Sequence, residues 1–186
     1  HFILGTEESH VYLIGNYARD KDAAGAAVWI CEHAAELKKN KKTLLDDLAE
    51  IYARYGYCHN YLTEIRLLGA KGMEQILYIM NHLRETKLDS FGEFSVHEKV
   101  DRRDGEPQPH LSRTDSSARN VLIYHMDNRE DTTSMRVTVR PSGTEPKIKM
   151  YFEVFGKPFK LENIDSEKKK IIDIRQDLEK TFMQYC

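Results

Sequence analysis

The alternation of hydrophobic and polar positions predicts several β-strands in the second half of the chain. Polar and apolar residues alternate over residues 61–68, and short apolar stretches recur at 94–100, 121–127, 134–140 and 147–155. Stretches of this length, with a period of two residues, are typical of strands with one buried face. No repeating strand–helix–strand unit connects them, so we expect an antiparallel sheet rather than a parallel one.

Two further stretches have helical periodicity. Apolar side chains recur at every third or fourth position after Met73, and again after Ile171 in a helix that begins at Asp165 or Ser166. Each pattern places one apolar stripe along an amphipathic helix. We therefore expect an α+β domain, with an antiparallel sheet of about four to five strands and two helices on one of its faces.

The first part of the chain has a different organisation. Residues 2–4 and 11–14 predict two short strands, and an alanine-rich helix follows with Asp20 or Asp22 at its N-cap. Trp29 lies among the alanines of this helix, and we expect it to pack in the core. The first part therefore predicts a mixed α/β structure.

A second helix is predicted to begin at Thr43, which together with Asp46 resembles a capping box. The character of the sequence changes after this helix. We therefore expect two domains, which comprise residues 1–58 and 59–186. Within the second domain, residues 101–119 are almost devoid of aliphatic side chains and predict a long polar loop.

Composition narrows the class of protein. The chain has 186 residues, with 28 Lys and Arg against 30 Asp and Glu and a formal net charge of −2. This balance argues against nucleic acid as a partner, and no apolar stretch approaches the roughly 18 residues that a membrane span needs. Three widely spaced cysteines, Cys31, Cys58 and Cys186, indicate neither a disulfide framework nor a zinc site, and we expect a cytoplasmic protein.

Candidate chemistry concentrates in a predicted hairpin over residues 135–154. If the apolar side chains of both strands share the core, Arg140, Lys147 and Lys149 lie together on the solvent side. These three basic residues flank the sequence PSGTEP at 141–146. The hairpin therefore predicts a loop with positive charge on both of its sides.

The residues of this loop suit a phosphate site. Ser142 and Thr144 supply hydroxyl groups, and Gly143 lets backbone N–H groups approach an anion closely. Arg140 is able to form bidentate, charge-assisted hydrogen bonds with phosphate oxygens. Proline, serine, glycine and threonine are also ordinary turn residues. The residue types alone therefore leave a plain hairpin turn as an equal alternative.

The segment from Arg140 to Lys149, RPSGTEPKIK, resembles the C-terminal phosphate-binding loop of the α-D-phosphohexomutases, the family of phosphoglucomutase and phosphomannomutase. Three upstream segments resemble the same family in order and spacing: TEES at 6–9, RDKD at 19–22 and TLLDDLAEIY at 43–52. The last is similar to the branch that contains bacterial phosphoglucomutases and phosphopentomutases. The resemblance extends over nearly the whole chain.

This resemblance implies a role for each matching segment. Residues 1–58 would be the end of the sugar-binding third domain, where Glu7 and Ser9 contact sugar hydroxyls and Lys21 lies near the sugar or its phosphate. Residues 59–186 would be the fourth domain, with a fold like that of the TATA-box-binding protein. The residues implied to hold the non-reacting phosphate are Arg140, Ser142, Gly143, Thr144, Lys147 and Lys149.

Other parts of the family pattern have no match in this sequence. It contains no serine nucleophile loop and no DxDxD loop, and the charge of Lys21 between Asp20 and Asp22 repels Mg²⁺. In the family these loops belong to the N-terminal domains, so Mg²⁺ is implied only for the parent enzyme. Phosphoryl transfer depends on the positioned nucleophile and the metal, and we expect this chain to be inactive by itself.

The resulting hypothesis is the C-terminal portion of a mutase that interconverts sugar 1-phosphate and 6-phosphate through a bisphosphate intermediate. Its partners would be a hexose or pentose phosphate and the missing N-terminal domains, and glucose, mannose and pentose remain open. The alternative is a stand-alone sugar-phosphate-binding or interaction module without catalysis. Because part of the third domain is missing, we also expect exposed apolar surface on residues 1–56.

Overall fold

The chain forms two compact units, His1–Ile51 and Tyr52–Cys186. The sequence pattern predicts a boundary after residue 58, whereas the units divide inside helix α2 (Leu44–Tyr55). The structure is a computed structural model, and it describes residues 2–7, 11–17, 22–87, 89–103, 119–128, 133–142 and 145–186.

The first unit begins with a two-stranded antiparallel ribbon. Strand β1 (Leu4–Glu7) pairs with β2 (Val11–Ile14), and the Gly15 N–H donates to the Ile3 carbonyl at 3.0 Å. β2 has the predicted bounds. β1 lies further along the chain than the predicted residues 2–4, because pairing with β2 sets its bounds and apolar character alone does not.

Both helices of this unit begin with side-chain caps that the sequence predicts. α1 (Ala23–Lys39) starts at Asp22, whose carboxylate accepts a hydrogen bond from the Gly25 N–H at 3.0 Å. Before α2, the Asp46 N–H donates to Thr43 Oγ1 at 3.2 Å, and Asp46 Oδ2 accepts from the Thr43 N–H at 2.8 Å. These bonds satisfy backbone N–H groups that lack a partner inside a helix.

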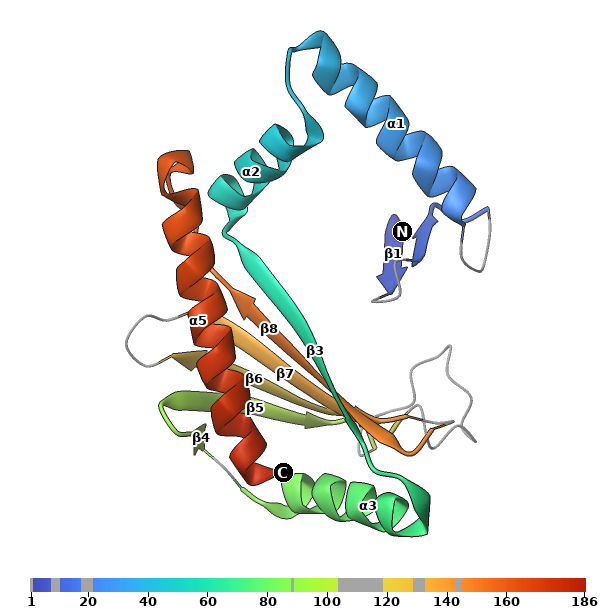
Figure 1. Ribbon diagram of the computed structural model, residues 1–186, viewed down its shortest axis with the longest axis vertical. Helices are drawn as coiled ribbons and strands as arrows, with labels where there is room; N and C mark the ends of the chain where they lie inside the picture. Colours follow the sequence, from blue (N-terminus) through green and yellow to red (C-terminus); the bar gives the residue numbers. More distant parts are fainter. Residues whose placement is uncertain are drawn as a thin grey trace. The chain divides into compact units, whose positions relative to one another are not determined.

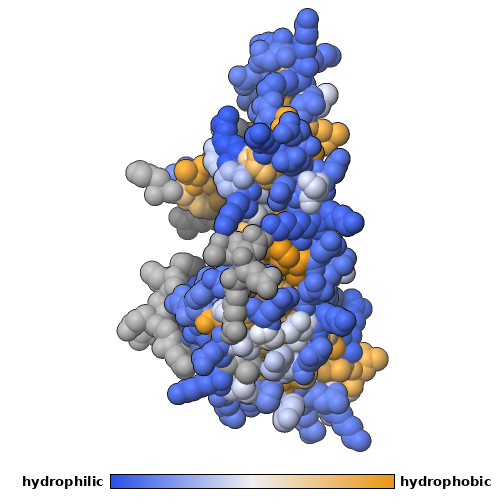
Figure 2. Space-filling view, turned by 90° about the vertical axis from the view of Figure 1, so that its left-hand side faces the viewer, coloured by the Kyte–Doolittle hydropathy of each residue, from blue (hydrophilic) through white to orange (hydrophobic). Residues whose placement is uncertain are grey.

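The first unit has little core of its own. Among its described large hydrophobic side chains only Leu37 is buried, because a two-stranded ribbon and its helices cannot enclose an apolar interior. Trp29 is 62% exposed, so the expectation that it packs in the core is wrong. The expected exposed apolar surface is confirmed, and hydrophobic side chains show as orange patches on the molecule (Figure 2). The exposed large hydrophobic side chains of the first unit include Phe2, Ile3, Leu4, Val28, Trp29, Ile30 and Leu45.

The second unit is built on a six-stranded antiparallel sheet with the order β3-β8-β7-β6-β5-β4. Two helices, α3 (Gly69–Glu85) and α5 (Ile164–Phe182), lie on one face of this sheet (Figure 1). The predicted fold class is confirmed, and the short β4 adds one strand to it. The strands are β3 (Cys58–Arg66), β4 (Ser90–Phe91), β5 (Phe94–Asp101), β6 (Leu122–Asn128), β7 (Ser134–Pro141) and β8 (Lys147–Phe155).

The core of this unit lies between the sheet and the two helices. Buried and half-buried positions alternate along β8, as the period of a strand requires. The buried residues of the strands form one cluster with the apolar faces of α3 and α5. Among its fully buried members are Met80, Leu83, Val137, Val139, Ile148, Met150, Phe152, Val154, Leu178 and Phe182.

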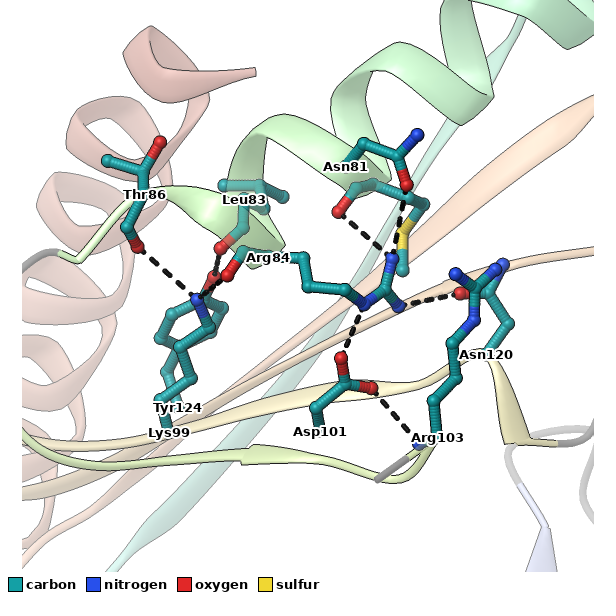
Figure 3. A network of polar contacts seen from close by, with 10 residues as sticks. Asn81, Leu83, Arg84, Thr86, Lys99, Asp101, Arg103, Asn120 and Tyr124 are labelled. Atoms are coloured by element: carbon teal, nitrogen blue, oxygen red, sulfur yellow. Dashed lines mark hydrogen bonds and ion pairs between the residues drawn. The ribbon is translucent and has the colours of Figure 1, made fainter. Parts of the chain in front are cut away.

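A network of polar contacts holds the C-terminal end of α3 against the sheet (Figure 3). Lys99 Nζ donates to the carbonyls of Arg84 and Thr86, at 2.5 and 3.2 Å. The Tyr124 hydroxyl donates to the Leu83 carbonyl at 2.8 Å. The last carbonyls of a helix lack partners inside it, and a cation there also stabilises the negative end of the helix dipole.

The same network fixes one end of the sheet. The Arg84 guanidinium pairs with the Asp101 carboxylate and donates from Nη2 to Asn120 Oδ1 at 2.9 Å. Asp101 pairs with Leu122, and Leu122 pairs with Val139 near the end of β7. The network therefore lies at the end of the sheet where the β7–β8 hairpin turns.

Helix α5 holds the edge strand β3. Arg175 and Glu179 of α5 form an ion pair, and the Arg175 guanidinium carbon lies 4.2 Å from the centre of the Tyr61 ring. Glu179 also accepts a hydrogen bond from Thr63 Oγ1 at 2.5 Å. Arg175 is buried, which a charged side chain tolerates when it is paired. These contacts fix β3 against α5.

The core assignment predicts a large loss of stability for Phe152→Ala. Phe152 is fully buried, and its ring packs 5.9 Å from that of Phe182. The substitution should lower the free energy of unfolding by about 3–5 kcal/mol, because it leaves a cavity in a packed core. Urea denaturation followed by circular dichroism measures this change. The control Leu68→Ala, at a side chain that is 84% exposed, should change it little, and equal losses in both variants would contradict the assignment.

Candidate phosphate-binding site

The candidate site lies where the β7–β8 hairpin turns. In the antiparallel register Arg140 stands directly opposite Lys149. Their neighbours Val139, Ile148 and Met150 are fully buried, so strand alternation places Arg140 and Lys149 on the face away from the helices. Arg140 is exposed and Lys149 is half-buried. The two basic side chains thus share one face, as the hairpin pattern predicts.

Strand β3 brings two further charged residues to this face. β3 pairs with β8 on the side opposite β7, and this register sets Glu64 against Lys149 and Arg66 against Lys147. The sequence predicts a strand at 61–68, but nothing in the sequence says which strand it pairs with. Sequence reasoning therefore missed Glu64 and Arg66, because only the register reveals their place.

Glu64 lies at the centre of an ion-pair cluster. Its Oε1 is 3.1 Å from Lys147 Nζ and 3.8 Å from Lys149 Nζ, and its Oε2 is 3.5 Å from Arg66 Nη2. Lys147 Nζ also lies 2.8 Å from Glu145 Oε2. Lys147 therefore bridges a carboxylate of β3 and a carboxylate of the loop.

The cluster favours the ionised forms of its members. Hydrogen bonding by Lys147 lowers the pKa of Glu64, and the charges of Lys147 and Lys149 lower it further. Lys147 lowers the pKa of Glu145 in the same way. Hydrogen bonds to Glu145 and Glu64 in turn raise the pKa of Lys147. All three groups are therefore charged at neutral pH.

Backbone hydrogen bonds shape the described part of the loop. The Ser142 N–H donates to the Lys147 carbonyl, and the Lys147 N–H donates to the Glu145 carbonyl, both at 2.8 Å. The Leu67 N–H, just after β3, donates to the Pro146 carbonyl at 2.9 Å. The loop is thereby tied both to its own hairpin and to the end of β3.

The structure brings together only some of the predicted site residues. Arg140 and Ser142 lie at the end of β7, and Lys147 and Lys149 lie at the start of β8. Glu7 is the last residue of β1, and its side chain is outside the described part of the structure. The predicted site residues that lie wholly outside the described ranges are Ser9, Lys21, Gly143 and Thr144.

The described residues do not fit a Mg²⁺ site. Among them, no three His, Cys, Asp or Glu side chains gather closely enough to hold a metal ion. The described member of the Asp20-Lys21-Asp22 segment, Asp22, caps α1. The helices within the described ranges also lack the length and apolar character needed to cross a bilayer.

Sequence comparisons point to one family. Residues 118–174 match the family model described as the phosphoglucomutase/phosphomannomutase C-terminal domain. The chain is 34% identical over 153 residues to a phosphoglucomutase of Staphylococcus aureus strain MRSA252, covering 80% of this chain and 27% of the relative. Against a phosphoglucomutase of strain MSSA476 it is 31% identical over 185 residues, covering 91% and 29%. The chain thus spans less than a third of the length of these curated relatives.

A solved structure has a similar fold. The exocytosis-sensitive phosphoprotein parafusin from Paramecium, described as a phosphoglucomutase in its open form, aligns with a TM-score of 0.52 at 13% identity. The alignment covers 96% of this chain and 30% of parafusin. The matched family segment contains β6, β7, β8 and the basic end of their hairpin. The chain therefore belongs to the α-D-phosphohexomutase superfamily and corresponds to the C-terminal portion of its members.

Proposed function

We propose that this chain is the C-terminal, substrate-holding portion of a phosphoglucomutase-type enzyme. The whole enzyme would interconvert the 1-phosphate and 6-phosphate of glucose or mannose through a bisphosphate intermediate. The names of the matched relatives support an enzyme of this type. A pentose phosphate is the alternative substrate class.

The gathering of cations at the end of the β7–β8 hairpin carries this proposal. Arg140, Lys147, Lys149 and Arg66 lie there on three neighbouring strands, and they outnumber the carboxylates of Glu64 and Glu145. A phosphate monoester is a dianion near neutral pH, so excess positive charge beside a loop with hydroxyl and N–H donors is what it requires. A plain hairpin turn needs no such excess.

Arg140 is the residue best suited to contact the phosphate directly. It is exposed, and it stands on the strand that enters the loop. Its guanidinium matches two phosphate oxygens at once. Ser142, Gly143 and Thr144 would complete the site with hydroxyl and backbone donors. Lys149, opposite Arg140, would add positive charge.

Residues of the first unit would contact the sugar of the substrate. Glu7 would accept hydrogen bonds from sugar hydroxyls, and Ser9 would add another hydrogen bond. Lys21 would lie near the sugar or its phosphate. The phosphoserine and the Mg²⁺ site would belong to the N-terminal domains of the same cytoplasmic protein. This chain would then bind substrate without transferring the phosphoryl group.

Arg140→Ala should weaken binding of glucose 6-phosphate to the full chain by at least about tenfold, since a charge-assisted hydrogen bond contributes about 1.5–3 kcal/mol. Isothermal titration calorimetry measures the affinity. The matched control is Arg136→Ala, on the same strand and face but paired with Glu153, and it should bind nearly as well as the unaltered chain. Equal affinities of the Arg140 variant and the unaltered chain would refute the assigned phosphate site.

The chain by itself should show no mutase activity. A coupled assay that converts glucose 1-phosphate to glucose 6-phosphate should give the buffer rate, with and without Mg²⁺ and a catalytic amount of glucose 1,6-bisphosphate. A full-length staphylococcal phosphoglucomutase serves as the positive control. Turnover by the chain that is lost on Arg140→Ala would show that the activity belongs to the chain itself, against this proposal.

A further inference from the structure

Lys147 is a basic residue of the site whose charge is balanced by two nearby carboxylates. Its ammonium lies 2.8 Å from Glu145 and 3.1 Å from Glu64, and its side chain is only 12% exposed. An ammonium has three donors, and two of them are directed at carboxylates in this arrangement. Lys147 is therefore placed to join two parts of the protein rather than to receive an added anion.

The two carboxylates that Lys147 joins come from different segments. Glu145 belongs to the loop, and its side chain is 56% exposed. Glu64 is 26% exposed and lies on β3, next to Thr63, which hydrogen-bonds to Glu179 of α5. One end of the bridge is thus fixed to the folded core and the other end lies on the loop.

We propose that Glu64 is a positioning residue of the phosphate site, which holds the C-terminal side of the loop, Glu145 and Pro146, on β3 through Lys147. This inference rests on the proposed function and deepens it. Arg140 and the loop donors contact the phosphate, while Lys147 acts on the loop. The hydrogen bond from the Leu67 N–H to the Pro146 carbonyl, at 2.9 Å, is the backbone part of the same attachment.

Charge repulsion and the positioning role predict opposite effects of a substitution at Glu64 on phosphate binding. A carboxylate close to a bound dianion repels it, so Glu64→Gln should tighten phosphate binding if charge alone matters. If Glu64 positions the loop, the same substitution should weaken binding, because the loop must then be ordered at the cost of binding energy. The sign of the change therefore separates the two readings.

The first experiment compares phosphate affinity in variants of the full chain. Glu64→Gln should weaken binding of inorganic phosphate and of glucose 6-phosphate about two- to fivefold, in the range of a modest ion pair. The matched control is Glu153→Gln, which removes a carboxylate from an ion pair on the same face. Glu153 lies four residues, or about 13 Å, along β8 from Lys149, the partner of Glu64 in the register. Equal or tighter binding by Glu64→Gln would overturn the inference.

The second experiment needs no ligand. Amide hydrogen exchange at Leu67, followed by NMR, reports on the bond to Pro146. Exchange should become faster in Glu64→Gln and in Lys147→Met, and it should stay unchanged in Glu153→Gln. Lys147→Arg keeps a positive charge between both carboxylates, so its exchange should stay close to that of the unaltered chain. The double variant of Glu64→Gln and Lys147→Met should exchange no faster than Lys147→Met alone. Unchanged exchange in Glu64→Gln, or additive effects in the double variant, would overturn the inference.

The two experiments separate this inference from the proposed function. Failure of the unaltered chain to bind phosphate would count against the proposed phosphate site, while the exchange at Leu67 would still decide whether Glu64 holds the loop. Binding that depends on Arg140 but tightens in Glu64→Gln would keep the proposed function and refute the positioning role.

Discussion

The antiparallel register of β3, β8 and β7 is the constraint on which the site depends. Because side chains alternate along each strand, one register decides which residues meet the helices and which meet at the opposite face. It places Glu64, Lys149 and Arg140 in one row across three strands, while Met150 and Val139 enter the core. A slip of one residue would exchange the two sets, so the burial of the core also fixes the arrangement of the charges.

The packing on the other face of the sheet supports this row from two directions. α5 secures β3 through Arg175 and Glu179, and the C-terminal end of α3 is held at the same end of the sheet by Lys99 and Arg84. In both places a charged side chain is half or fully buried and paired, which fixes geometry as much as it adds stability. The candidate site thus rests on ordered elements, and the hairpin presents the basic side chains that are proposed to bind phosphate.

The sequence predicts the elements of the second unit well, because strand and helix periods are strong over β7, β8 and α5. It predicts the basic hairpin end for the same reason, since apolar residues alternate with Arg140 and Lys149 on paired strands. It misses Glu64 because strand order is a long-range property that local patterns do not contain. The prediction for Trp29 is wrong for a different reason: an apolar residue on an alanine-rich helix becomes buried only where another surface covers it, and the described residues of the first unit leave Trp29 exposed.

The central claim is that strands β3, β8 and β7 together form a phosphate site. A map of backbone amide shifts on titration with inorganic phosphate tests it most directly. The account predicts that the shifts concentrate at Arg140, Lys149 and the end of β3 around Glu64. Shifts that instead gather at the open pocket along α5, of about 670 Å³ and lined in part by Lys169 and Lys170, would contradict the account.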